Sequence, residues 1–101
     1  MDSTIKLYAN AYIKNSYGVD VPTETPKEVF CEVRSITSQE FFMAGRNGLN
    51  PAYLFIVFAA DYEGEVIVEY EKQTYSIYRT FKPDSSDYVE LYAERKGGSN
   101  G

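Results

Sequence analysis

Residues 65–81 have the sequence EVIVEYEKQTYSIYRTF, which predicts a β-hairpin. Apolar residues alternate with more polar ones on both sides of the short link Lys72-Gln73, and a period of two is typical of a half-buried strand. Two antiparallel strands should therefore lie side by side, each with one face toward the core. The expected inward residues are Val66, Val68 and Tyr70 on the first strand, and Tyr75, Ile77 and Phe81 on the second.

Four further strands are predicted around this hairpin. Tyr53–Ala60 is continuously apolar, so both faces of that strand should be covered, by the core or by another subunit. The other three strands show alternation. Their expected inward residues are Ile5, Leu7, Ala9, Ala11 and Ile13 in the first strand, Val29, Cys31 and Val33 within Glu28–Ile36, and Val89, Leu91 and Ala93 in the last strand.

A short helix is predicted between the strand Glu28–Ile36 and the strand Tyr53–Ala60. Thr37-Ser38-Gln39-Glu40 has the Thr-x-x-Glu spacing of a capping box. A helix over Ser38–Ala44 should follow and should close at Gly45 or Gly48, because glycine favours the end of a helix. The alternative is a hairpin in which Phe41-Phe42-Met43 is a strand and Asn47-Gly48 its turn. We favour the helix.

These elements predict an all-β fold, a small antiparallel β-barrel or sandwich of about six strands with one short helix. Residues 1–95 should form a single barrel-like domain, and residues 96–101, KGGSNG, a flexible C-terminal tail. Val19–Lys27 contains two prolines and should be an extended loop, because proline disfavours helix in the residue before it.

Composition excludes several classes of site. The 101 residues suffice for one domain and include no histidine, which excludes His-based acid–base catalysis, His metal sites and Ser-His-Asp triads. A single cysteine excludes an intramolecular disulfide and a Cys-rich zinc site. No combination of nucleophile, base and oxyanion donors can be named. We therefore expect no enzyme activity, no cofactor and no metal.

The charge balance bears on partners. Fifteen acidic against ten basic residues give a net charge of −5, so the chain as a whole should be repelled by nucleic acid. The longest apolar run, Ala52–Ala60, is shorter than a membrane-spanning helix, and no basic-then-apolar leader is visible. We expect an intracellularly made, soluble protein without a membrane partner.

The order of motifs resembles the phage head closure, or head–tail adaptor (head–tail joining), proteins of long-tailed phages. Members commonly show a strand, a polar-Tyr-Gly turn, a second strand ending in a Trp-Ala-x-Val type segment, a helix start, a hydrophobic strand and a Tyr-rich hairpin. The corresponding stretches here are Asn15-Ser16-Tyr17-Gly18, Phe30-Cys31-Glu32-Val33, Ser38-Gln39-Glu40 and Val68–Ile77. The resemblance covers roughly Ile5 to Arg95, with Phe30-Cys31 in place of the Trp-Ala pair.

This resemblance implies a structural role in the virion. Such proteins form a homo-oligomeric ring beneath the portal–adaptor complex, close the DNA channel after packaging and offer a platform to the tail. The expected locations are the virion and, during assembly, the host cytoplasm. The expected partners are the portal–adaptor and tail proteins. The residues that the resemblance suggests for contact with packaged DNA in the channel are those of the polar loop Arg46, Asn47, Gly48, Leu49 and Asn50; an ordinary connection is an equal alternative.

Subunit contacts are expected on aromatic side chains. Tyr8 and Tyr12, with Lys6 and Lys14, should form the outer face of the first strand, and tyrosine is enriched at interfaces. Stacking of nucleotide bases and a plain half-exposed face are the alternatives. Tyr53 and Phe55 lie in the continuously apolar strand that an adjoining subunit should help to cover.

Two further features have plain structural interpretations. Asp61, Glu63, Glu65, Glu69 and Glu71 should form a solvated outer face, because acidic residues are seldom buried. Cys31 should be packed in the core. The rival functions are a non-enzymatic cellular binding module that uses a Tyr-rich sheet face, and an OB-like nucleic-acid binder, which the net charge disfavours.

Overall fold

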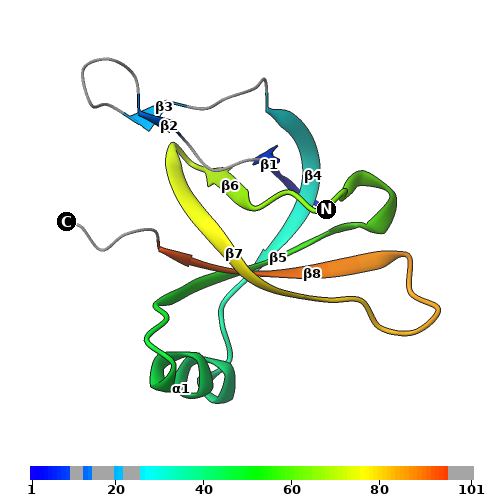
Figure 1. Ribbon diagram of the computed structural model, residues 1–101. Helices are drawn as coiled ribbons and strands as arrows, with labels where there is room; N and C mark the ends of the chain where they lie inside the picture. Colours follow the sequence, from blue (N-terminus) through cyan, green and yellow to red (C-terminus); the bar gives the residue numbers. More distant parts are fainter. Residues whose placement is uncertain (10–12, 15–19, 22–25, 96–101) are drawn as a thin grey trace.

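Six strands of alternating sequence close into an antiparallel barrel (Figure 1). The computed structural model describes residues 1–9, 13–14, 20–21 and 26–95, with only the backbone described at 13–14 and 20–21. The elements are β1 (Ser3–Tyr8), β2 (Ile13–Lys14), β3 (Asp20–Val21), β4 (Lys27–Arg34), α1 (Ser38–Arg46), β5 (Pro51–Phe58), the 3-10 helix η1 (Ala59–Asp61), β6 (Ile67–Tyr70), β7 (Gln73–Phe81) and β8 (Tyr88–Arg95).

The strand order around the barrel is β1-β4-β5-β8-β7-β6, and the ladder between β6 and β1 closes it. The predicted barrel with one short helix is therefore confirmed for the described residues, whose six main strands form one closed sheet and not a two-sheet sandwich. Closure pairs every barrel strand on both sides, which removes the exposed edges that promote aggregation. A separate ladder joins β2 to β3, so Asp20–Val21 is a short strand inside the stretch that we predicted to be a loop.

The barrel interior is filled by one apolar cluster contributed by all six strands. Most of the predicted inward residues are there, because alternation fixes the side of a strand on which each residue lies. The core residues are Ile5, Leu7, Val29, Cys31, Phe55, Val57, Val68, Tyr75, Val89, Leu91 and Ala93.

The first strand is shorter than predicted. β1 ends at Tyr8, and Ala9, expected in the core, is exposed. Tyr8, expected on the outer face, is only 6% exposed. It pairs with Ile67 of β6, which is also buried, and its hydroxyl donates a hydrogen bond to Glu69. Ala11 lies outside the described residues.

Two of the residues predicted to face inward in the hairpin are exposed, each for its own reason. β6 begins at Ile67, so Val66 precedes the strand and is exposed. In β7 the register shifts between Ile77 and Arg79, which reverses the alternation and turns Phe81 outward. The tight turn consists of Glu71 and Lys72, both with positive φ, as a two-residue primed turn requires.

The helix prediction is confirmed and the competing hairpin is wrong. The Thr37 hydroxyl accepts a hydrogen bond from the Glu40 backbone N–H, as the capping box predicts. The helix continues beyond Ala44 to Arg46. Gly48, with φ +80°, allows the Leu49 N–H to reach the Ala44 carbonyl, and the Gly48 N–H to reach that of Gly45. These two bonds form a Schellman motif, which satisfies carbonyl groups that the helix end would otherwise leave unpaired.

Candidate interaction surface

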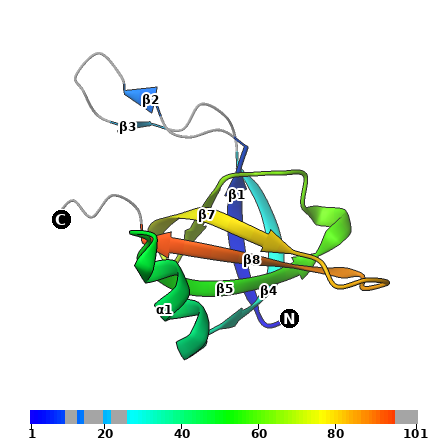
Figure 2. The same ribbon diagram turned by 60° about the horizontal axis from the view of Figure 1, so that its bottom comes forward.

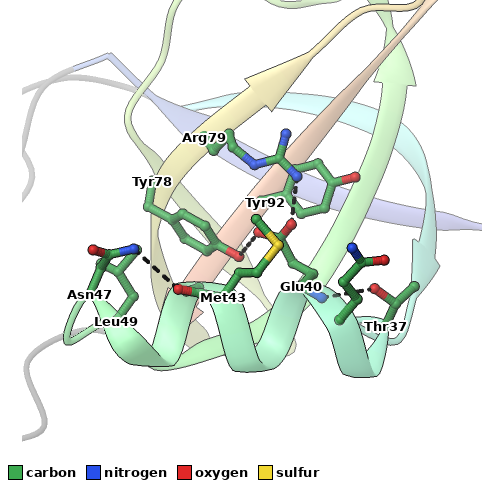
Figure 3. A pocket seen from close by; sticks show the side chains of 10 residues that line it. Thr37, Glu40, Met43, Asn47, Leu49, Tyr78, Arg79 and Tyr92 are labelled. Atoms are coloured by element: carbon green, nitrogen blue, oxygen red, sulfur yellow. Dashed lines mark hydrogen bonds and ion pairs between the residues drawn. The ribbon is translucent and has the colours of Figure 1, made fainter.

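The helix α1 is fastened to the outside of the barrel by one carboxylate. Glu40 accepts a hydrogen bond of 2.7 Å from the Tyr78 hydroxyl and forms an ion pair of 2.6 Å with Arg79, both on β7 (Figure 3). Burial alone would raise the pKa of Glu40, but the bonds from Arg79 and Tyr78 outweigh it and hold that pKa below its usual value. The same helix turn thus provides both a capping contact and a charged anchor.

The anchor continues onto β8 through an aromatic ring. The guanidinium carbon of Arg79 lies 3.9 Å from the centre of the Tyr92 ring, a cation–π contact. The Tyr92 hydroxyl in turn donates to Glu90 at 2.7 Å. Burial, with the bond to the carboxylate, raises the pKa of Tyr92, and the same two causes raise that of Tyr78. Both rings therefore stay neutral donors over the physiological pH range.

A groove lies between α1 and the outer face of β7 and β8, with a volume of ≈ 500 Å³. Figure 3 shows the Met43 side chain extending over it from the helix, with Tyr78, Arg79 and Tyr92 on the strand side. Both carboxylate oxygens of Glu40 already accept bonds from the protein. Glu40 therefore holds the helix in place against β7. The remaining lining residues are Thr37, Gln39, Ala44, Asn47 and Leu49.

The segment Arg46–Asn50 comprises the last residue of α1 and the connection to β5. Arg46 is the last residue of α1, and the Asn47 side chain donates to the Met43 carbonyl. Asn50 is tied to β8 twice, because its N–H donates to the Glu94 carboxylate and its carbonyl accepts from the Arg95 N–H. The segment therefore sets the direction in which the chain enters β5.

The exposed side of α1 is apolar. Phe41, Phe42 and Met43 are 49%, 68% and 54% exposed, and the two phenylalanine rings meet edge to face. We name these three side chains the helix surface. Only Ala44 of the helix is buried, so anchoring by charged and polar groups leaves the large apolar residues in solvent. Sequence reasoning missed this surface, because an apolar run beside a capping box predicts a core-facing helix.

A second exposed apolar group lies where β5 ends and β8 begins. The rings of Phe58 and Tyr88 stack with their centres 5.0 Å apart, and both residues are 41% exposed. Phe81 of β7 is 49% exposed and is paired across the ladder with Glu90, two residues from Tyr88. We name Phe58, Phe81 and Tyr88 the aromatic surface. The bulge in β7, which the sequence does not reveal, is what turns Phe81 outward.

The four residues predicted at a subunit interface are placed differently from one another. Phe55 is fully buried and Tyr8 is 6% exposed, so both belong to the packing of their own chain and offer little surface to another. Tyr53 is half-buried and packs edge to face against Tyr70 and Tyr75. Tyr12 lies outside the described residues. Phe55 is buried because it belongs to the core inside the closed barrel, whereas Tyr8 lies on the opposite face of β1 from Leu7, beside the buried Ile67.

The acidic stretch is not a uniformly solvated face. The Glu65 side chain is 7% exposed, lies 3.0 Å from the Lys27 ammonium, and accepts a 2.7 Å hydrogen bond from the Glu63 N–H. Glu69 accepts the hydroxyl hydrogen of Tyr8. Burial alone would raise the pKa of Glu65, but the bonds from Glu63 and Lys27 lower it overall. Lys27 is far away in the sequence, so this pair could not be seen before the fold was known.

Cys31 is in the core, as predicted, with no exposed surface. Burial raises the pKa of its thiol to about 11, which suppresses the reactive thiolate. Within the described ranges, no three His, Cys, Asp or Glu side chains lie close enough to hold a metal ion. The same part of the chain has no helix with the length and apolar character needed to cross a membrane.

Comparisons with known proteins return no relative. No protein-family model matches the chain, and searches of curated proteins and of solved structures find no match.

Proposed function

We propose that this protein is a structural component of a phage virion, a head closure or head–tail adaptor protein. In this role it forms a ring beneath the portal–adaptor complex, retains packaged DNA and offers a platform for tail attachment. It acts in the virion and, during assembly, in the host cytoplasm. No enzyme activity, cofactor or membrane partner is part of the proposal.

The observation that carries the proposal is the order of elements. The family pattern is strand, turn, strand, helix, hydrophobic strand and hairpin, and the chain has β1, β4, α1, β5 and the β6–β7 hairpin in that order. A closed barrel with a helix inserted between two strands is a rigid block with a protruding element. Such a block suits an assembly part, which must keep its shape while it contacts several neighbours.

Two exposed apolar surfaces also support a role in assembly. The helix surface and the aromatic surface each gather three large side chains that the chain does not cover. Large exposed apolar patches mark sites of protein–protein contact more often than scattered single residues do.

The loop proposed to face the DNA channel is Arg46–Asn50. Arg46 belongs to α1, so the part of this loop that lies between elements is Asn47–Asn50.

The proposal is tested with the portal–adaptor rings of the phage that encodes the protein. The purified protein should co-purify with those rings and add a ring of density at their exit by electron microscopy. Particles assembled without it should hold DNA that nuclease can reach, and they should fail to join tails. Full infectivity of particles that lack the protein would overturn the proposal. So would specific capture of an unrelated soluble protein by a monomer, or salt-sensitive binding of single-stranded DNA, as the rival functions predict.

A further inference from the structure

The two exposed apolar surfaces lie at opposite ends of the same strands. Four residues separate α1 from β5, which begins at Pro51, and Phe58 is the last residue of that strand. Eight residues of β-strand place those ends roughly 23 Å apart, at about 3.3 Å per residue. Figure 2 shows α1 at one end of β5 and β8, and η1 with the β7–β8 turn at the other. One chain therefore cannot bring its own two surfaces together.

The aromatic surface has a hollow beside it. Next to Phe58 lies a depression of ≈ 470 Å³, lined by Ala59, Ala60 and Ser86 together with the charged residues Asp61, Asp87 and Lys82. Its lining combines small apolar residues with two carboxylates and one ammonium group, so its net charge is negative. A hollow of this composition suits an apolar ring that carries a positive charge next to it.

The helix surface has the matching features. Phe42 is the most exposed of its three side chains, at 68%. Arg46 follows Phe42 by four residues, and residues four apart lie on the same side of a helix. The protruding helix therefore presents an aromatic ring and a guanidinium together, opposite in charge to the acidic residues of the hollow. Arginine and phenylalanine are also enriched at protein interfaces, where aspartate is depleted unless it is paired.

We propose that α1 of one copy docks on the aromatic surface of a second copy, with Phe42 in the hollow beside Phe58. Arg46 of the first copy then pairs with Asp61 or Asp87 of the second. Because the two surfaces differ, the contact is head-to-tail, and repetition of one head-to-tail contact closes a ring when the rotation permits. The inference depends on the proposed function only for the ring, and it names the surfaces through which the copies meet.

Cysteine cross-linking of the purified protein tests the contact. Gly45→Cys, one helix turn from Phe42 and with open space around it, leaves Phe42 and Arg46 in place. Gly45→Cys and Lys82→Cys are made in separate chains, which are mixed over a concentration series and treated with a short bis-maleimide. The native Cys31 is fully buried and does not compete. Phe30→Cys, on an outward position of β4 that is 63% exposed, is the matched control. All three changes are at exposed or surface positions, so thermal unfolding should be little altered.

Cross-links between positions 45 and 82 should form about tenfold or more faster than 45–45, 82–82 or 30–82 links, because a docked contact raises the effective concentration of the two thiols. A chain that carries both Gly45→Cys and Lys82→Cys should give a ladder of products larger than dimers. Equal rates for all pairs would overturn the proposal. A ladder that stops at dimers would also overturn it, because it would show a two-fold contact.

Charge reversal gives an independent readout. Arg46→Glu should slow 45–82 cross-linking, and Asp87→Lys in the second chain should restore it if the guanidinium meets the hollow. Failure of rescue by both Asp87→Lys and Asp61→Lys would overturn the assigned pairing. Absence of 45–82 cross-links in a protein that still co-purifies with portal–adaptor rings would overturn this contact alone and leave the proposed function standing.

Discussion

Glu65 is the residue whose replacement should most clearly show how the barrel is held closed. The chain crosses from β5 to β6 through η1 and the residues after it, and β6 then pairs with β1 to close the barrel. Lys27, at the start of β4, holds this crossing segment through its 3.0 Å ion pair with Glu65. The Tyr62 hydroxyl reinforces it by donating to the Glu65 carbonyl. The pair thus links the connection to a strand on the neighbouring wall.

Replacing Glu65 by Gln should lower the free energy of unfolding by about 2 kcal/mol. A hydrogen bond to a charged group contributes about 1.5–3 kcal/mol, and breaking a fully buried pair costs about 3–5 kcal/mol. The lower range applies, because Lys27 keeps 37% of its side chain exposed and can be rehydrated when its partner is lost. The amide oxygen of Gln can still accept the Glu63 N–H. For a domain of this size, the change corresponds to a fall in Tm of roughly 10 °C.

The loss should depend on pH with a definite sign. The folded-state pKa of Glu65 lies below its unfolded value near 4.5, so its contribution is fully present above that value. It is lost as the pH falls through the folded pKa, because the protonated carboxyl resembles the amide of Gln. The free energies of unfolding of the two proteins, from urea unfolding curves, should therefore differ by about 2 kcal/mol at neutral pH and converge as the pH falls through the folded-state pKa of Glu65.

Glu63→Gln is the matched control. Glu63 also contacts Lys27, at 3.5 Å, but its side chain is 79% exposed, and exposed pairs contribute little. Its replacement should change the free energy of unfolding by less than about 0.5 kcal/mol. An equal loss for both variants, or a Glu65→Gln loss that does not shrink as the pH falls through the folded-state pKa of Glu65, would refute the argument from burial and charge.

Further predictions concern the backbone, the thiol and nucleic acid. Gly48→Ala should destabilise the protein by about 1 kcal/mol in thermal unfolding, because Gly48 has φ +80°. Gly45→Ala should stabilise it by about 0.5–1 kcal/mol, because Gly45 lies in the helix and a Cβ there meets no other atom. Lys72→Gly should raise the free energy of unfolding by about 0.5–1 kcal/mol, since Lys72 has φ +67°; a loss of stability would contradict the assigned strain. Cys31 should react with iodoacetamide only as fast as the protein unfolds, and rapid labelling of the native state would show that it is accessible. The isolated protein should pass through a duplex-DNA column at about 0.15 M salt, where retention would contradict the expected effect of its negative charge.

Alternation is a local property, and it accounts for what could be predicted. Val89, Leu91 and Ala93 are buried because a strand with period two has no other way to cover its apolar face. The Thr37 cap is equally local, since its partner is three residues away. Strand number, the site of the helix and most of the core follow from features of this kind.

Contacts between strands decided the features that the sequence pattern did not predict. Tyr8 is buried beside Ile67, its partner in the β1–β6 ladder, and Phe81 is exposed because of a register shift against β8. The Lys27–Glu65 pair and the Glu40 contacts with β7 each join residues 38 or 39 positions apart in the sequence. Phe41 and Phe42 remain exposed, while Glu40 and the buried Ala44 contact the rest of the chain. Partners distant in sequence leave no periodic signal along the chain, so only the folded barrel shows which side chains are covered and which stay free for another molecule.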